Sequence, residues 1–150
     1  DIQDRVYQEI QSVVKSVTPT TEELSKLHLV EQVINETLRM HPPAPIVTRK
    51  ALETRTYEGV TIPKGAQVLI PYYHIMTDPS VYPDPKTFNP DRFSPEEKDK
   101  RDLMAFIPFG QGPRQCLGMR LALLELKVAL VHILRKMKSV VNDQTVPRKG

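Results

Sequence analysis

A single cysteine, Cys116, stands where a glycine-containing loop meets an apolar run that reaches about residue 136. An anionic sulfur at this position meets the free N–H groups and the positive dipole end of the helix that the run predicts, which favours the thiolate form. Gly110 and Gly112 predict a tight loop whose backbone can approach another body closely. The guanidinium of Arg114 suits a carboxylate. A lone thiolate beside such an arginine indicates a soft axial ligand to haem iron, with the arginine on a haem propionate.

Other interpretations of this loop fit the sequence less well. A free cysteine is usually a small buried hydrophobic residue, but the surrounding loop argues against that role for Cys116. A phosphate loop needs a third glycine where Gln115 stands, and Pro113 removes a donor. Zinc needs several cysteines or histidines at close spacing, which one cysteine does not supply. The four histidines share no ligand spacing: His28, His41, His74 and His132.

Residues 109–118 resemble the haem-binding loop of the cytochrome P450 superfamily, whose pattern is F-x-x-G-x-R-x-C-x-G. The chain matches this pattern at Phe109, Gly112, Arg114, Cys116 and Gly118. The resemblance implies a haem b whose axial thiolate comes from Cys116, with no other catalytic residue in this stretch. It also implies contacts to the haem from several further residues, Arg49 being a second propionate-binding arginine: Arg49, Pro108, Gly110, Leu117 and Ala122.

Glu36 and Arg39 are three residues apart on a predicted helix, so they share one face and can pair directly. The ordinary interpretation is a solvated ion pair that contributes little. In the superfamily, however, an E-x-x-R helix precedes the thiolate loop and meets the arginine of an F-x-P-x-R-F segment, which this chain supplies at residues 88–93. The resemblance therefore implies a buried structural network of Glu36, Arg39 and Arg92.

The same resemblance places four residues on a substrate-lining segment, although ordinary strand packing explains them equally well: Pro43, Ala44, Ile46 and Val47. The chain also departs from the superfamily, which commonly shows H-R-D-P where this sequence has Met76-Thr77-Asp78-Pro79. Hydrogen bonds made by that histidine and arginine therefore have no counterpart here.

The predicted elements describe a mainly α protein with a small β region (α+β), interpreted over residues 1–150 as the C-terminal part of a single cytochrome P450 domain. Thr20 and Glu23 form a capping-box pattern at the start of a helix that is broken near Lys26. On the last helix, Arg120, Glu125 and Lys127 mark a narrow polar side where an acidic reductase could dock. We expect helices at about 1–17, 21–40 and 116–136, strands within 46–71 around a Glu58-Gly59 turn, and a meander with the haem loop at 79–118.

Composition sets broad limits on the function. The chain has 150 residues, which is about one domain, and 39% hydrophobic residues, which is typical of a globular protein. A net charge of +3 does not indicate nucleic-acid binding. One cysteine excludes an internal disulfide and suits a reducing compartment. No apolar run approaches the ~20 residues of a membrane span, and the absence of a starting methionine indicates a piece of something longer.

The resemblance implies the C-terminal portion of a microsomal eukaryotic haem-thiolate monooxygenase. Such an enzyme inserts one oxygen atom from O₂ into a small apolar organic substrate, with electrons from a reductase. It lies on the cytosolic face of the endoplasmic reticulum membrane, anchored by an N-terminal part that this sequence lacks. We expect the fragment alone to be inactive. Two alternatives are a haem-thiolate isomerase or dehydratase that acts on peroxides, and a truncated, non-catalytic product.

Overall fold

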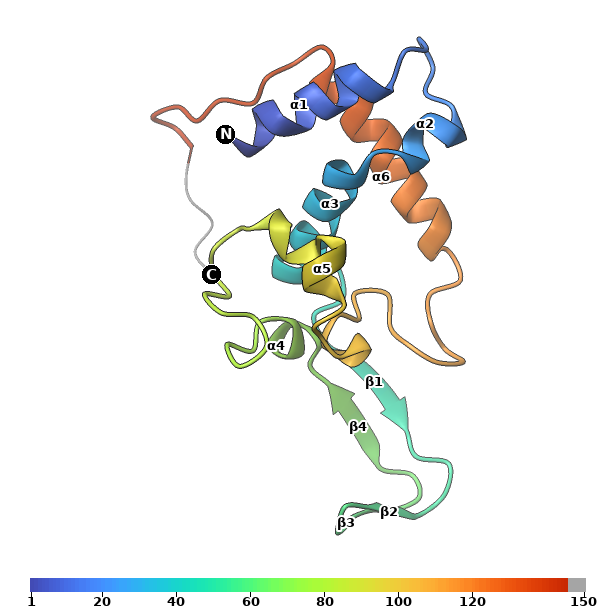
Figure 1. Cartoon of the computed structure of the whole chain (residues 1–150). Helices are drawn as coiled ribbons and strands as arrows, with labels where there is room; N and C mark the ends of the chain where they lie inside the picture. Colours follow the sequence, from blue (N-terminus) through green and yellow to red (C-terminus); the bar gives the residue numbers. More distant parts are fainter. Residues whose placement is uncertain (146–150) are drawn as a thin grey trace. The chain divides into compact units, whose positions relative to one another are not determined.

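The computed structural model describes residues 1–145, which belong to two compact units (Figure 1). Unit 1 comprises residues 1–31 and the described residues from Arg120 onward, and unit 2 comprises Gln32–Met119. Residues 109–118, called the thiol loop below, lie within unit 2, and so does the predicted ion-pair network of Glu36, Arg39 and Arg92. The protein is mainly helical with a small β region, as the sequence predicted.

In unit 1, helix α1 (Ile2–Val13) begins at Asp1, whose carboxylate accepts a hydrogen bond from the Gln3 N–H. Its apolar stripe buries Val6 and Ile10. The prediction that this helix reaches residue 17 is wrong, because Val14 is already extended.

The early end of α1 has a non-local cause. The Glu23 carboxylate accepts hydrogen bonds from the backbone N–H groups of Lys15 (2.8 Å) and Ser16 (3.1 Å), which a longer helix would need for its own ladder. Val17, predicted to extend the apolar stripe, is therefore exposed in the connection.

The capping box predicted at Thr20 is confirmed at the start of helix α2 (Thr21–Ser25). The Thr20 hydroxyl accepts from the Glu23 N–H at 3.2 Å, and the Glu23 carboxylate accepts from the Thr20 N–H at 2.9 Å. The break predicted near Lys26 separates α2 from helix α3 (His28–Met40). Glu9 of α1 caps α3 by accepting from the N–H groups of Leu29 and Val30.

Helix α6 (Met119–Leu134) begins three residues later than the sequence predicted and is not evenly buried. Val131 and Lys127 are its buried residues. Leu121 remains 59% exposed, and Leu124, Leu126 and Ile133 are exposed as well. Much of the apolar circumference of this helix is therefore exposed in the structure.

In unit 2, the strands form two nested antiparallel hairpins. Strand β1 (Val47–Lys50) pairs with β4 (Gln67–Ile70), and β2 (Arg55–Tyr57) pairs with β3 (Val60–Ile62). Figure 1 shows the longer pair, β1 and β4, side by side, and the shorter pair, β2 and β3, at the end of that hairpin. The turn predicted at Glu58-Gly59 is confirmed: both residues have positive φ, which closes the two-residue β2–β3 connection. Ile46, expected to begin a strand, precedes β1.

The remainder of unit 2 consists of short helices and loops around a small apolar cluster. Tyr72 and Met76 of helix α4 (Tyr72–Met76) pack with Ile107 in this cluster. Four half-buried apolar residues pack against it: Val47, Ile70, Ile75 and Phe106. The connecting segments contain helix α5 (Pro95–Lys98) and two 3-10 turns, η1 (Pro90–Phe93) and η2 (Leu103–Ala105). The cluster thus fixes the segment that leads into the thiol loop.

Candidate functional site

The thiol loop is shaped by two glycines in the left-handed region. Gly110 has φ +77° and Gly112 has φ +81°, conformations that other residues adopt only with strain. The Gly110 N–H donates to the Ile107 carbonyl at 2.9 Å, and the Cys116 N–H donates to the Phe109 carbonyl at 2.9 Å. The loop therefore folds back on itself and ties the backbone of Cys116 to the start of the loop.

Gly110 also fits closely against helix α4. A Cβ atom at Gly110 would lie 3.1 Å from the Tyr72 hydroxyl, whereas a Cβ at Gly112 would meet no heavy atom of the chain within 4 Å. The first glycine thus allows close packing inside unit 2. At the second glycine, only the backbone conformation requires glycine in this structure.

The thiol of Cys116 is exposed just before α6, whose first backbone bond runs from the Met119 N–H to the Cys116 carbonyl. Leu117 is fully exposed at 103% of its reference area, although it is a large apolar residue. Arg114 is exposed as well. This donor set fits a haem: an accessible soft ligand, a cation that can meet a propionate, and an uncovered apolar side chain that a macrocycle could cover.

The other predicted cofactor residues belong to several different segments of the chain. Arg49 lies half-buried on β1 and donates a hydrogen bond to the Thr48 carbonyl at 2.9 Å. Pro108 is half-buried and Gly118 exposed. Ala122, half-buried on α6, belongs to unit 1. Pro108 precedes the loop and Gly118 ends it, whereas Arg49 lies on β1 and Ala122 on α6.

The predicted substrate-lining residues precede and enter β1. Pro43 and Ala44 are exposed, and Ile46 is exposed to 55%. Val47 instead packs against the cluster of Tyr72, Met76 and Ile107. Ordinary packing therefore accounts for Val47 but not for the other three residues.

Glu36 and Arg39 form an ion pair that is completely buried, with no exposed side-chain area on either partner. The Arg39 Nε donates to Glu36 Oε2 at 2.7 Å, and Nη2 donates to Oε1 at 3.0 Å. This is the bidentate geometry in which charged hydrogen bonds are strongest. A solvated surface pair, the ordinary interpretation of this spacing, is therefore excluded.

The same pair holds three backbone segments of unit 2. Glu36 Oε1 accepts a hydrogen bond from the Asn89 N–H at 2.9 Å. Arg39 donates to the carbonyl of Met76 at 3.1 Å and to that of Pro85 at 2.8 Å. Two side chains on α3 thus satisfy backbone groups on α4 and on the meander, groups that would otherwise be costly to bury.

The structure also places Arg92 beside this pair, with its Nε 3.6 Å from Glu36 Oε1. That distance is an ion pair and not a hydrogen bond. Among the side-chain atoms of the described residues, Arg92 Nε is the one buried nitrogen or oxygen without a hydrogen-bond partner. Its Nη2 donates to the Asp84 carbonyl at 3.0 Å. Arg92 thus forms an ion pair with Glu36 and donates a hydrogen bond to the backbone of the meander.

Tyr82 and Arg101 also contact this network, although the sequence did not predict either residue for it. The Tyr82 ring is fully buried, and its hydroxyl donates to the Ala105 carbonyl at 3.1 Å. The guanidinium carbons of Arg39 and Arg101 lie over the ring, at 5.1 and 5.0 Å from its centroid. Burial raises the pKa of Tyr82, and the neighbouring arginines oppose that rise. The proline-rich sequence around Tyr82 predicts a loop, so no periodicity marked this residue as buried.

The prediction that Lys127 lies on an exposed polar side of α6 is wrong, because its side chain is buried. Lys127 is only 9% exposed, and its Nζ donates to Glu31 Oε2 at 2.7 Å and to the Leu24 carbonyl at 3.2 Å. Its charge is therefore used inside unit 1 and is not available to a docking partner. Arg120 and Glu125 remain exposed.

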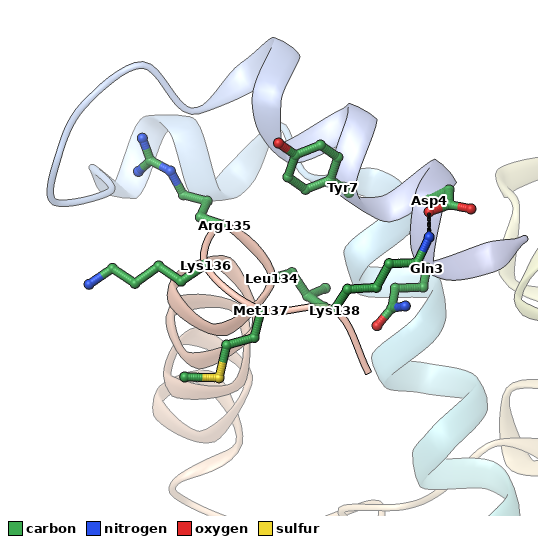
Figure 2. A pocket seen from close by; sticks show the side chains of 8 residues that line it. All are labelled: Gln3, Asp4, Tyr7, Leu134, Arg135, Lys136, Met137 and Lys138. Carbon is green, nitrogen blue, oxygen red and sulfur yellow. Dashed lines mark hydrogen bonds and ion pairs between the residues drawn. The ribbon is translucent and has the colours of Figure 1, made fainter. Parts of the chain in front are cut away.

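A hollow of about 360 Å³ lies in unit 1 between the start of α1 and the end of α6 (Figure 2). Although its lining is basic, Lys138 reaches across to pair with Asp4 at 2.7 Å. Arg135 donates to the Ser16 carbonyl at 2.8 Å, and Lys136 points away from the Asp4–Lys138 pair. None of the residues that the sequence predicted for the site lines this hollow.

Several known proteins are similar to this chain over nearly its whole length. The sequence model of the family Cytochrome P450 matches residues 1–149. A probable cytochrome P450 6a14 of Drosophila melanogaster is 40% identical over 97% of this chain and 30% of its own length. Cytochrome P450 3A29 of Sus scrofa is 38% identical (90% and 27%), and lithocholate 6-beta-hydroxylase of Mesocricetus auratus is 38% identical (97% and 29%). The chain thus spans less than a third of the length of these relatives.

Proposed function

The chain belongs to the cytochrome P450 family, and on that premise we propose that it is the C-terminal part of a haem-thiolate monooxygenase whose iron ligand is Cys116. The observation that carries the proposal is the exposed thiol, held by a loop with two left-handed glycines directly before a long helix. The whole protein, called the full-length enzyme below, would insert one oxygen atom from O₂ into a small apolar organic substrate. A reductase would supply the electrons.

The residues of the loop would bind and orient the cofactor. A bound haem supplies the oxygen-activating chemistry, and a thiolate ligand favours O–O cleavage. Cys116 provides the sulfur, and its N–H bond to Phe109 fixes the direction in which the side chain leaves the loop. Arg114, with Arg49 as a second candidate, would hold the propionates. Leu117 would be covered by the macrocycle, which accounts for its exposure here.

The buried network of Glu36, Arg39 and Arg92 would support the same loop indirectly, through the elements that lead to it. Because Arg39 and Arg92 pair with the buried Glu36 and bond backbone carbonyls, we assign all three residues a structural role. They hold α4 and the meander in fixed positions relative to α3. Because the cluster of Tyr72, Met76 and Ile107 joins α4 to the segment that leads into the loop, this network would set the place of the thiol.

The family also suggests the partners and the location that we propose for the full-length enzyme. An acidic surface of the reductase would dock on exposed basic groups, among which Arg120 remains and Lys127 does not. Pro43, Ala44 and Ile46 are the exposed candidates for contact with substrate. We propose the cytosolic face of the endoplasmic reticulum membrane as the location. Across residues 1–145, the structure contains no helix that is both long and apolar enough to span a membrane.

The full-length enzyme with Cys116→Ala tests the proposal. We expect the variant to lose the thiolate-type Soret band of the reduced, CO-bound form, because alanine cannot supply the thiolate that Cys116 would give to the iron. Gln111→Ala, at an exposed position of the same loop, is the matched control and should keep that band. If Cys116→Ala retains the complete thiolate-type spectrum, Cys116 is not the ligand. The 150-residue chain expressed alone should show no such band.

A further inference from the structure

Tyr82 and Arg101 connect the buried ion pair to the meander of unit 2. Arg39 lies over the Tyr82 ring with its guanidinium carbon 5.1 Å from the centroid, while its nitrogens bond Glu36. Arg101 lies over the same ring at 5.0 Å. One fully buried aromatic ring is therefore in contact with two cations, both attracted by its π electrons.

Arg101 makes two further contacts that tie it to η1. Its guanidinium carbon lies 4.9 Å from the centroid of the Phe93 ring, and its Nη2 donates to the Arg92 carbonyl. Phe93 in turn packs against Phe106, with ring centroids 4.6 Å apart. Arg101 thus holds η1, whose Phe93 packs against the segment that continues toward Cys116.

The Tyr82 hydroxyl reaches that segment directly through its hydrogen bond to the Ala105 carbonyl. Ile107, two residues on, is buried in the apolar cluster, and its carbonyl accepts from the Gly110 N–H. The Cys116 N–H then closes the loop onto Phe109. An uninterrupted series of contacts within unit 2 therefore leads from the ion pair to the thiol.

We propose that Tyr82 and Arg101 are positioning residues for Cys116, which transmit the rigidity of the Glu36–Arg39 pair to the thiol loop. This inference rests on the proposed function for its meaning in catalysis. Neither residue touches substrate or the reacting atoms. Their effect is exerted through the backbone of residues 105–116, which carries the glycine turns and Cys116.

Charge balance explains why the aromatic ring matters. Arg39 and Arg92 both pair with Glu36, and Arg101 brings a third cation to the Tyr82 ring. The face of that ring attracts Arg39 and Arg101 without adding a second buried carboxylate. Removing Arg101 would relieve repulsion but would also release η1 from Tyr82, so we expect a looser loop with an intact ion pair.

The test compares variants of the full-length enzyme by two measurements. Arg101→Met removes the cation but keeps the length of the side chain, Arg101→Lys keeps a cation, and Tyr82→Phe keeps the ring but loses the hydroxyl. Arg55→Met is the matched control, because Arg55 is an exposed arginine of unit 2 paired with Glu53. Amide hydrogen exchange reports the mobility of residues 105–116. The share of haem that shows the thiolate-type Soret band, at equal haem content, reports the placement of the sulfur.

We expect Arg101→Met to speed exchange in residues 105–116 by at least about 2- to 30-fold, the range for loss of one of its two cation–π contacts, and to lower the share with the thiolate-type band. Arg101→Lys should restore part of both, Tyr82→Phe should speed exchange around residue 105, and Arg55→Met should change neither. Equal effects of Arg101→Met and Arg55→Met, or faster exchange spread evenly over unit 2, would overturn the inference.

Two further results keep the inference separate from folding and from the proposed function. If Arg101→Met does not fold, Tyr82→Phe decides alone, and unchanged exchange at residues 105–107 overturns the inference. If the unmodified enzyme lacks the thiolate-type band, the proposed function fails. The exchange measurement still judges in that case whether Tyr82 and Arg101 hold the loop.

Discussion

Replacing Glu36 by glutamine in the full-length enzyme removes the charge of a buried carboxylate while keeping its size. Glu36 accepts three hydrogen bonds, two from Arg39 and one from the Asn89 N–H. A glutamine amide offers one oxygen and one NH₂ group, so at least one of the two Glu36 oxygen positions becomes a donor that faces a donor. The change therefore removes both the charge and part of the hydrogen bonding.

The magnitude follows from the burial of the pair. Neither Glu36 nor Arg39 has exposed side-chain area, so water cannot replace the lost partner. Loss of one partner of a buried ion pair costs about 3–5 kcal/mol, and Arg92, 3.6 Å from Glu36 Oε1, adds a second cation without its counter-charge. We therefore expect the unfolding equilibrium to shift by roughly a hundred- to several-thousand-fold.

Replacing both partners by methionine distinguishes the pair from its backbone contacts. A buried ion pair exchanged for apolar residues is often neutral in stability. Here, however, the Asn89 N–H and the carbonyls of Met76 and Pro85 would lose their partners. Each such loss costs about 1–3 kcal/mol, so the double variant should remain less stable than the unmodified enzyme.

Equilibrium urea unfolding, followed by far-UV circular dichroism, measures both changes in the free energy of unfolding. Glu22→Gln is the matched control, because Glu22 pairs with Lys26 at 2.6 Å on an exposed helix surface. Exposed pairs contribute little, so this control should unfold at nearly the urea concentration of the unmodified enzyme. A Glu36→Gln enzyme as stable as the Glu22→Gln control would refute the assignment of a buried, indispensable ion pair.

Three further predictions use the same unfolding assay. Gly110→Ala and Gly112→Ala should each lose about 1–2 kcal/mol from positive φ, and Gly110→Ala should lose more because its Cβ would lie 3.1 Å from a tyrosine hydroxyl; equal losses would show that this contact is unimportant. Backbone hydrogen bonds, that of Thr20 foremost, lower the pKa of Glu23 from 4.5 to about 2. The stabilisation by Glu23 should therefore be complete above about pH 4.5 and decline as the pH falls through 2, while Glu23→Gln should flatten this dependence. Lys127→Met keeps the apolar stem but leaves a buried α2 carbonyl without its donor, which should cost about 1–3 kcal/mol, whereas an unchanged stability would place Lys127 at the surface as the sequence suggested.

Local chemistry could be predicted from the sequence, because its signals lie within a few residues. The capping box of Thr20 and Glu23 needs one helical turn, and the Glu58-Gly59 connection needs two residues that accept positive φ. The spacing of Glu36 and Arg39 likewise fixed that they share a face. It did not reveal that they are buried, since burial depends on Met76, Pro85 and Asn89, far along the chain.

Predictions failed where a distant group competes for the backbone or for a side chain. Helix α1 ends early because Glu23 captures the N–H groups that would continue it. Lys127 is buried because Glu31 and a carbonyl of α2 receive its ammonium group. Helical periodicity describes only the face on which a residue lies, so it counted Lys127 as polar and exposed. The contact of Tyr82 with two arginines was hidden because the proline-rich sequence around Tyr82 predicts a loop, where no periodicity marks a buried residue.

The thiol loop and the groups behind it show opposite patterns of burial. Cys116, Arg114 and Leu117 are exposed, as the proposed contact with a haem would require, and exposed groups on a loop are held by few contacts of their own. Their accuracy must therefore come from groups that are buried, and in unit 2 those include the ion pair, Tyr82 and the cluster of Tyr72, Met76 and Ile107. A change at Cys116 should thus abolish ligation with little effect on stability, whereas a change at Glu36 should weaken the fold and displace a chemically intact thiol. Spectra and unfolding measured on the same two variants would show whether ligation and support are separable in this way.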